Sequence, residues 1–425
     1  MAEQLRNPRG TRDYYGKEQQ LRKYIRQTLE KVFAEYGYEE AEAPVLNYYE
    51  TLALKYAGGA EILKEVYQLS DQGGRQLSLR YDLTVPFARL VGTNPQLSSF
   101  YRRYEIGKVF RDGPVKTGRL REFTQCDVDM VGVNSILAEA ELMAMAVDIF
   151  QRLDLEVVIS YNHRQLLENI LKKTGIQAER YSEVILSLDK LDKIGQTAVA
   201  KELNQKGFAY PVIENIFARL KQVALDSRGE VMGSAELQEM QSYLVALGIE
   251  EKTQFNPGLA RGLDIYTGTV FEVFLKNSSI TSSIASGGRY DRIIGSFLGD
   301  GADYPAVGMS FGMDVIFQAL LEQGTVGQSN IDVFIIPLDT GVEALKLAQA
   351  LRKKQVRVLI DMKERKLKKS LDYANKSLIP YVIVLGSQEV ETGIISLKNM
   401  LTGAEATISV QELTGDPQAF LVSTN

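Results

Sequence analysis

Residues 119–132, with the sequence RLREFTQCDVDMVG, place an amide and two carboxylates a few positions after a cluster of cations. In a strand, side chains alternate between two faces. One face of this segment would then carry Phe123, Gln125, Asp127 and Asp129, and the other Thr124, Cys126, Val128 and Met130. The nearby cations are Arg111, Lys116, Arg119 and Arg121. Such a face could hold a charged ligand. Taken alone, however, these fourteen residues favour an edge strand that shows its polar face to water.

Two motifs that contain arginine lie far apart in the chain. The first is FRDGPVKTGRLREF, and the second is ARGLDIYTGTVFE, in which Arg261 directly precedes Gly262. An arginine beside a glycine can approach a phosphate or carboxylate closely and bind it with two parallel hydrogen bonds. The alternative for both motifs is a solvated or paired surface arginine. The segment SGGRYD lacks the Lys-Ser/Thr of a P-loop, and no G-x-G-x-x-G follows a strand. Any nucleotide would therefore be held by arginines on an antiparallel sheet.

The composition limits the kinds of site that the chain can build. A length of 425 residues predicts two or three domains. The single cysteine, Cys126, excludes an intrachain disulfide and a multi-cysteine zinc site. The single histidine, His163, disfavours a Ser-His-Asp triad and most histidine metal sites, so we expect a surface or capping residue there and no protein-bound metal. No apolar run is long enough to cross a bilayer, and the polar start MAEQLRNPRGTRD is not a signal peptide. We therefore expect a cytoplasmic protein.

The charge is distributed unevenly. The net charge of −5 argues against a nucleic-acid binder. Residues 343–376, however, contain eleven Lys/Arg against four Asp/Glu, a local charge of +7 that leaves −12 for the remainder. Such asymmetry indicates a module that meets a polyanion, and a solvated basic helix face explains it equally well.

The periodicity predicts a mixed α/β protein. Apolar residues at helical spacing predict a helix over 17–36, and residues from about 164 to 250 read as helices with few strand signals. One strand is expected on each side of the loop DGPVKTGRLR. A linker is expected over 322–330. After it, strands alternate with helices, which predicts a small, mostly parallel sheet in a separate domain.

Six motifs in order make the chain recognisable. They are PRGTRD (8–13), LRYDLTVPFAR (79–89), FRDGPVKTGRLREFTQCDVD (110–129), RGLDIYTGTVFE (261–272), GGRYD (287–291) and AVGMSFGMD (306–314). Together they resemble the histidyl-tRNA synthetases, a class II family. The C-terminal RKLKKSLDYANKSLIPYVIVLG is similar to the anticodon-binding domain of that family. The resemblance implies an α+β catalytic core over 1–325, built on an antiparallel sheet flanked by helices. It also implies a helical insertion over 170–252 and an α/β anticodon-binding domain over 331–425.

The resemblance assigns five residues to histidine. Asp82 and Thr84 bind the α-ammonium, and Gln125 holds the amino-acid backbone. Asp129 accepts a hydrogen bond from the imidazole, with Tyr266 as its partner. Buried polar groups of this kind discriminate strongly in favour of a ligand that satisfies them.

Four further residues are assigned to ATP: Arg111, Arg119, Phe123 and Arg261. Arg111 contacts the α-phosphate and the histidine carboxylate, Phe123 stacks on adenine, and Arg261 is a catalytic cation beside the α-phosphate. Motif 3 of the family usually ends with an arginine that reaches the γ-phosphate. Val315 stands there in this chain, and Arg119 or Arg121 could supply the charge.

The implied reaction is the formation of histidyl-adenylate from histidine and ATP, followed by transfer of histidine to tRNA(His). Mg²⁺ is expected on the leaving phosphates. A homodimer is expected through motif 1, the helix ending at Tyr36 and the strand around Pro44. Ile265 replaces one of two paired tyrosines, and Asp112-Gly113 replaces an acidic residue that often faces the adenine.

Two alternatives differ in class from a synthetase. One is the histidine-binding regulatory subunit of ATP phosphoribosyltransferase, which resembles the catalytic core but performs no aminoacylation. It commonly lacks the anticodon-binding domain that this chain resembles. The other is a tRNA-binding sensor without chemistry.

Overall fold

The computed structural model describes residues 5–55, 63–115, 119–225, 235–260, 265–325, 329–363 and 365–421. The chain divides into two compact units, one of residues 1–12 and 25–324 and the other of residues 13–24 and 325–425. The helix α1 (Gly16–Glu35) contributes to both. No helix among the described residues is long and apolar enough to cross a membrane.

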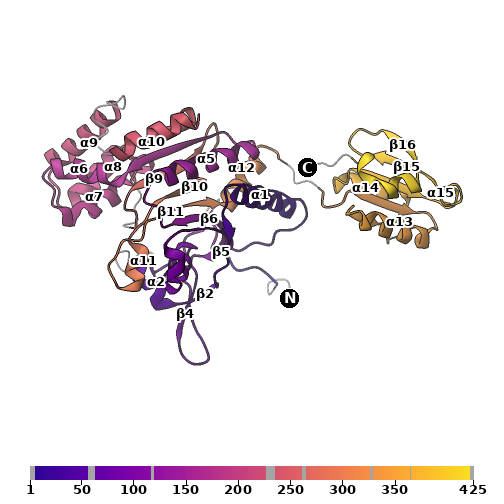
Figure 1. Cartoon of the computed structure of the whole chain (residues 1–425), viewed down its shortest axis with the longest axis horizontal. Helices are drawn as coiled ribbons and strands as arrows, with labels where there is room; N and C mark the ends of the chain where they lie inside the picture. The colour runs from indigo at the N-terminus through magenta and orange to yellow at the C-terminus, as the bar shows by residue number, and fades with distance from the viewer. Residues whose placement is uncertain are drawn as a thin grey trace. The chain divides into compact units, whose positions relative to one another are not determined.

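The first unit is built on an eight-stranded sheet (Figure 1). In spatial order the strands are β1 (Glu39–Glu40), β5 (Tyr101–Phe110), β6 (Glu122–Val131), β11 (Ala306–Gly312), β10 (Ala285–Arg289), β9 (Thr269–Leu275), β7 (Val157–His163) and β8 (Thr253–Phe255). The six inner strands pair antiparallel, and β1 and β8 add parallel edges. The predicted antiparallel sheet is therefore present. The edge-strand interpretation of residues 119–132 is wrong, because β6 lies between β5 and β11 with ladder hydrogen bonds on both sides.

Helices cover one face of this sheet with apolar side chains. The helices α1, α5 (Leu137–Arg152) and α12 (Met313–Glu322) lie along it (Figure 1). On β11, Phe311 is fully buried and its ring lies 5.7 Å from that of Phe33 in α1 and 5.9 Å from that of Phe150 in α5. Cys126 and Val128, from the apolar face of β6, are also fully buried. This packing occupies one face of β6, so the polar set on its other face is available to a site.

Smaller elements flank the sheet. They are a three-stranded antiparallel sheet of β2 (Leu46–Tyr48), β4 (Gln76–Leu79) and β3 (Gln68–Ser70), with α2 (Tyr49–Lys55), α4 (Thr84–Thr93), η2 (Pro95–Ser98) and α11 (Ile293–Leu298). The helices α2, α4 and α11 contact one another. A cluster that includes Phe87, Val91 and Ile294 packs α4 against α11, and another that includes Leu52 and Val85 packs α2 against α4.

Helices fill the chain between β7 and β8. They are α6 (Arg164–Lys173), η3 (Ala178–Arg180), α7 (Tyr181–Leu188), α8 (Leu191–Gln205), α9 (Tyr210–Leu225), α10 (Ala235–Ala246) and η4 (Glu250–Lys252). Since β7 and β8 pair with each other at the edge of the sheet, this helical region leaves and rejoins the sheet at one place.

The second unit contains a five-stranded sheet in the order β13-β12-β14-β15-β16. Its strands are β12 (Val333–Pro337), β13 (Val358–Ile360), β14 (Tyr381–Leu385), β15 (Ile394–Asn399) and β16 (Glu405–Ser409). Its helices are α13 (Gly341–Lys353), α14 (Leu367–Lys376), α15 (Ser387–Thr392), α16 (Val410–Gly415) and η5 (Pro417–Ala419). The first three strands pair parallel, as the alternation predicts, and β15 and β16 add an antiparallel hairpin that we did not predict.

Candidate active site

The floor of the candidate site is formed by alternate residues of three neighbouring strands. In register across β5, β6 and β11, the three rows are Arg103–Asp129–Gly308, Glu105–Asp127–Ser310 and Gly107–Gln125–Gly312. The sequence thus predicted the central column correctly, because a period of two places Gln125, Asp127 and Asp129 on one face. The flanking columns are set by strand register.

Two glycines leave the space that the polar groups occupy. A Cβ atom on Gly308 would lie 2.1 Å from Asp129 Oδ1, and one on Gly107 would lie 2.2 Å from Arg80 Nη2. Any larger side chain would displace a charged group from the floor. Glycine is therefore required at both positions for steric reasons.

The floor contains a buried network of two cations and three carboxyl groups. Arg80 Nη1 lies 2.6 Å from Glu105 Oε1, and Arg103 Nη2 lies 2.9 Å from Asp129 Oδ2. These groups and Asp127 are each less than 5% exposed. Burial, and then the neighbouring charge of Asp129, raise the pKa of Asp127 to about 7, while Arg103 and the Ser310 hydroxyl oppose this rise. The network therefore holds one carboxyl group that titrates near neutrality.

Asp129 and its partners join two parts of the predicted histidine site. The Tyr290 hydroxyl donates to Asp129 Oδ1, while Arg103 also donates to the Leu83 carbonyl oxygen at 2.9 Å. Burial, followed by the charge of Asp129, raises the pKa of Tyr290 well above its ordinary value, so this phenol remains a donor. Tyr266, which the resemblance pairs with Asp129, is buried in the same apolar cluster as Tyr290.

Asp82 and Thr84 lie where α4 begins. Asp82 is buried, and its Oδ1 accepts from the Val85 amide at 2.9 Å, which satisfies one donor of the first helical turn. Thr84 is the first residue of the helix. Leu83, between them, is the residue whose carbonyl oxygen Arg103 holds. Arg103 therefore links this turn to Asp129.

Gln125 is held by groups of the adjacent strand. Its Nε2 donates to Ser310 Oγ at 2.8 Å, and the Ser310 hydroxyl donates to Asp127 Oδ1. Gln125 Oε1 is buried, and no donor reaches it from the part of the chain that the structure describes.

Arg111 lies between two aromatic rings. Its guanidinium carbon is 4.3 Å from the centre of the Tyr81 ring and 4.9 Å from that of Phe123, and its Nε donates to the Tyr81 carbonyl oxygen at 3.2 Å. Stacking of this kind holds a guanidinium group in one orientation. The structure therefore brings Arg111 and Phe123 together, as their shared assignment to ATP requires.

The loop after Arg111 is tied to an acidic residue that we did not predict. Arg119 Nη2 lies 3.0 Å from Glu65 Oε1, and the Asp112 amide donates to the Glu65 carbonyl oxygen at 2.7 Å. Arg121 pairs with Asp112 at 3.1 Å. Both arginines that could replace the cation missing at Val315 are thus engaged with carboxylates. Lys116 and Arg261 lie outside the described residues.

His163, the single histidine, has a structural role in the cap of a helix. His163, the last residue of β7, is the N-cap of α6, and its Nδ1 accepts from the Gln165 amide at 3.3 Å, so the capping interpretation is correct. The residue is buried and not at the surface, and burial lowers its pKa. Among the described residues, no group of three His, Cys, Asp or Glu side chains could hold a metal ion.

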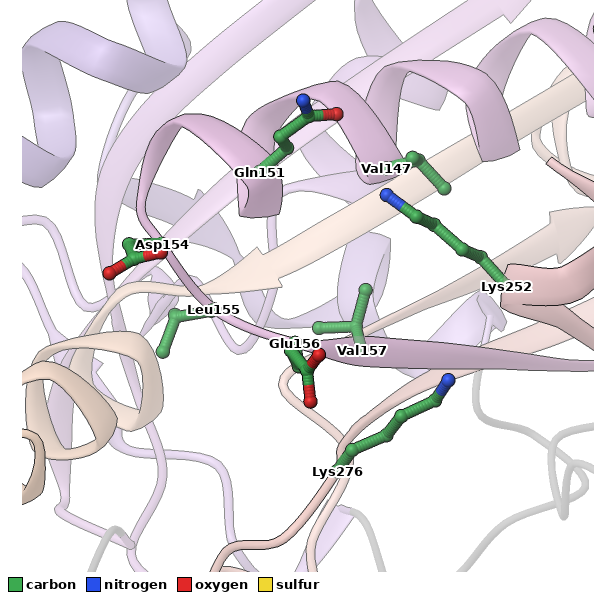
Figure 2. Close-up of a pocket in the computed structure, with 8 residues that line it drawn as sticks. All are labelled: Val147, Gln151, Asp154, Leu155, Glu156, Val157, Lys252 and Lys276. Atoms are coloured by element: carbon green, nitrogen blue, oxygen red, sulfur yellow. The ribbon is translucent and has the colours of Figure 1, made fainter. Parts of the chain in front are cut away.

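A separate hollow of about 180 Å³ lies where α5 ends and β7 begins (Figure 2). Its lining comprises Val147, Gln151, Asp154, Leu155, Glu156, Val157, Lys252 and Lys276. Two lysines and two carboxylates leave it without net charge. None of the predicted site residues that the structure describes lines it.

Six residues of the site were not predicted from the sequence: Glu65, Arg80, Arg103, Glu105, Tyr290 and Ser310. Tyr290 and Ser310 stand inside motifs that we quoted, GGRYD and AVGMSFGMD, so motif membership was a usable signal for them. Arg103 lies in a segment of alternating polarity, and Glu65 carries no local signal.

Comparisons with known proteins agree with this arrangement. The family model described as histidyl-tRNA synthetase matches residues 10–316, and the model described as anticodon binding domain matches residues 332–415. Histidine–tRNA ligase 1 of Bacillus cereus is 51% identical over 422 residues, which cover 97% of this chain and 99% of the relative. The cytoplasmic histidine–tRNA ligase of Dictyostelium discoideum is 34% identical, with 97% of this chain and 90% of the relative covered.

Among solved structures, a histidyl-tRNA synthetase from Nostoc superimposes with a TM-score of 0.82 at 27% identity, covering 98% of this chain and 99% of that one. A Bacillus halodurans protein titled as an ATP phosphoribosyltransferase regulatory subunit/histidyl-tRNA synthetase has a TM-score of 0.73 at 21% identity, covers 90% of this chain and 98% of that one, and supports the fold alone. Since the two relatives described above are ligases that match over most of both chains, and the anticodon-binding domain is matched, the regulatory-subunit alternative is not favoured. The polar floor, the motif order and these matches agree: the chain belongs to the histidyl-tRNA synthetase family.

Proposed function

We propose which residues of this histidine–tRNA ligase bind histidine, ATP and tRNA, and which of them act in catalysis. The observation that carries the proposal is the buried floor of β5, β6 and β11, which presents acceptors beside the stacked guanidinium group of Arg111. A zwitterion with a polar ring requires both kinds of group. We assign catalysis to residues 1–325, interrupted by the helical insertion 170–252, and anticodon binding to residues 331–425.

Histidine is bound by the floor and the turn before α4. Asp82 and Thr84 accept from the α-ammonium, and Gln125 Oε1, which no described residue reaches with a donor, supplies a further acceptor. Asp129, with Tyr266 nearby, accepts from the imidazole ring N–H. Because Asp129 is anchored by Arg103, the carboxylate presents a fixed acceptor to the ring.

ATP is bound at the Arg111 end of the floor. Arg111 binds the α-phosphate and the histidine carboxylate, Phe123 stacks on adenine, and Arg119 reaches the outer phosphates by leaving Glu65. Arg261 stands beside the α-phosphate in this proposal, on the strength of the motif alone. Mg²⁺ enters as the counter-ion of ATP, since that ion usually binds through substrate phosphates with one or two carboxylates.

The first step joins histidine to AMP. A carboxylate oxygen of histidine attacks the α-phosphorus, the bond from that phosphorus to the bridging oxygen breaks, and pyrophosphate leaves with its electron pair. Arg111 and Arg261 stabilise the negative charge that gathers on the α-phosphate oxygens. A terminal hydroxyl of tRNA(His) then attacks the carbonyl carbon, and AMP leaves with the proton accepted by its phosphate.

The second unit supplies affinity for tRNA. Lys366, Lys368 and Lys369 are exposed at the beginning of α14, inside the basic segment 343–376. Exposed cations of this density attract a phosphate backbone and release its counter-ions. Since charged tRNA is consumed by translation, we place the enzyme in the cytoplasm.

A homodimer completes the proposal. Val45, Leu46, Tyr48 and Leu69 are each at least 38% exposed, on or next to the small sheet that follows the predicted motif 1. A second copy that covered these side chains would remove an apolar surface from water. Sedimentation should give the mass of a dimer at micromolar concentration, and a monomer mass would contradict this part.

The experiment that tests the function is histidine-dependent exchange of pyrophosphate into ATP, followed by charging of tRNA(His). We expect exchange that requires histidine and charging that requires tRNA as well. Histidine binding without exchange would identify a regulatory protein, and tRNA binding without either step would identify a sensor.

A further inference from the structure

The side-chain amide of Gln125 has one end satisfied and one end free of donors. Its Nε2 donates to Ser310 Oγ at 2.8 Å and lies 3.5 Å from Asp127 Oδ1. Its Oε1 is buried, and nothing in the described ranges donates to it. A buried acceptor without a donor is unfavourable, so such a group is expected to meet a donor from a ligand.

The hydrogen count on Ser310 decides which end of the amide is which. A serine hydroxyl has one hydrogen and two lone pairs. When Asp127 is ionised it can only accept, so the serine hydrogen is directed at Asp127 Oδ1 and the oxygen of Ser310 can only accept from its other neighbour. Ser310 therefore requires the NH₂ end of Gln125 and rejects the oxygen end, which would place lone pairs against lone pairs.

We propose that Asp127 and Ser310 are positioning residues that hold Gln125 with its amide oxygen available to the α-ammonium of histidine. This inference rests on the proposed function, in which Gln125 binds the amino-acid backbone. The carboxylate of Asp127 takes the serine hydrogen, the serine oxygen takes the amide hydrogen, and the amide oxygen is left for the substrate. Neither Asp127 nor Ser310 needs to touch histidine.

The surroundings of Asp127 decide at which pH its carboxylate is available for this role. Asp127 is flanked by Asp129 on its own strand, by Arg103 and Glu105 on β5, by Ser310 on β11 and by Asp82 before α4. Burial, and then the charge of Asp129, raise the pKa of Asp127 to about 7, while Arg103 and the Ser310 hydroxyl oppose that rise, so the ionised form that accepts from Ser310 predominates above about pH 7. A protonated Asp127 could instead donate to Ser310, which would release the serine hydrogen and allow the amide to reverse.

The decisive variant is Asp127→Asn, which keeps the shape but can donate as well as accept. The amide introduced by this substitution can present its NH₂ group to Ser310, whose hydrogen then becomes available to the oxygen of Gln125. The reversed amide would direct its NH₂ group at the ammonium. We expect the KM for histidine in pyrophosphate exchange to rise about tenfold, the KM for ATP to stay within about twofold, and kcat to change less than the histidine KM. Ser310→Ala should give the same pattern.

The matched control is Glu202→Gln in the helical region. There the Ser187 hydroxyl donates to Glu202 Oε1 at 3.0 Å, which reproduces the serine–carboxyl pair away from the floor. This variant should leave both KM values unchanged. It therefore separates loss of a serine–carboxyl hydrogen bond in general from loss of this particular pair.

A ligand without the amine gives a readout that a merely structural role would not move. Imidazolepropionate lacks the α-ammonium, so its inhibition constant should change less than about twofold in Asp127→Asn while histidine loses about tenfold. Equal losses for both ligands, or no loss for either, would overturn the proposal. The variant Gln125→Ala distinguishes a wrong assignment of Gln125 from a wrong positioning role for Asp127 and Ser310. If Gln125→Ala leaves the histidine KM unchanged, the assignment of Gln125 fails. If Gln125→Ala raises the histidine KM while Asp127→Asn and Ser310→Ala leave that KM unchanged, the positioning role fails.

Discussion

The strands β6 and β14 occupy equivalent places in their sheets but are built from different residues. Each lies between two other strands. Both faces of β14 are apolar, since α13 and α16 pack against one side of its sheet and α14 against the other. One face of β6 is equally apolar, and the other buries Asp127 and Asp129. Burial of apolar residues alone therefore does not indicate a site, whereas burial of charged residues on one face of a strand does.

The two strands also differ in what they contribute to stability. A fully buried Ile or Val contributes roughly 1.5–3 kcal/mol through removal of apolar surface from water. A buried carboxylate contributes nothing of this kind, and it is tolerated only where cations and donors surround it. Arg80, Arg103 and Tyr290 are those partners in the catalytic unit. In the second unit the cations Lys366, Lys368 and Lys369 remain in water, where a large anion can reach them.

The largest effect is expected from removing the cation beside β6. Arg103→Met should destabilise the catalytic unit by about 3–5 kcal/mol, because Asp129 and Glu105 would be left buried without this partner. Ile383→Ala in β14 should cost about 2–5 kcal/mol as a cavity, with exchange activity retained. Urea denaturation together with exchange assays checks both. An Arg103→Met protein with wild-type stability would show that the pairing is dispensable.

The next effect concerns the reaction itself. Arg111→Ala should lower exchange by at least roughly 100-fold, or about 2.7 kcal/mol, while affinity for tRNA stays unchanged. Arg261→Ala should behave alike, and Arg261→Lys should recover little because an ammonium group lacks the planar fork. Arg164→Ala, which removes a pair with Glu168 in α6, is the control and should leave exchange intact. Near-normal exchange in Arg111→Ala would refute the assignment.

A smaller effect is expected in the second unit. Reversing Lys366, Lys368 and Lys369 to Glu should raise the Kd for tRNA about tenfold and flatten its dependence on salt, because phosphate contacts are lost. Histidine-dependent exchange without tRNA should not change, and it serves as the internal control. Filter binding at several salt concentrations measures the slope. An unchanged Kd and slope would mean that these lysines only keep the surface solvated.

The last effect separates stability from function at Asp127. Its pKa in the folded protein, about 7, lies above the ordinary value of 3.8, so the native state binds more protons between these two values. The free energy of unfolding contributed by this group therefore falls as pH rises through that window. Asp127→Asn does not titrate, so its Tm relative to the wild type should be higher at about pH 8.5 than at about pH 5.5. A difference that does not depend on pH would contradict the raised pKa.

Much of this molecule follows from local sequence. A period of two placed Phe123, Gln125, Asp127 and Asp129 on one face, and the order of six motifs identified the family. Alternation of strands and helices after residue 330 predicted the second α/β unit. These features depend on neighbours along the chain, which is why they can be recognised without coordinates.

Tertiary structure decided the rest. It made β6 an interior strand, although its polar face is typical of an edge. It brought Tyr290, just after β10, to Asp129 from 161 residues away, and the register of β11 on β6 brought Ser310 to Gln125 from 185 residues away. It also paired Arg119 with Glu65, 54 residues earlier. No local pattern encodes such pairings, because they arise only when distant strands align and bury each other's polar groups.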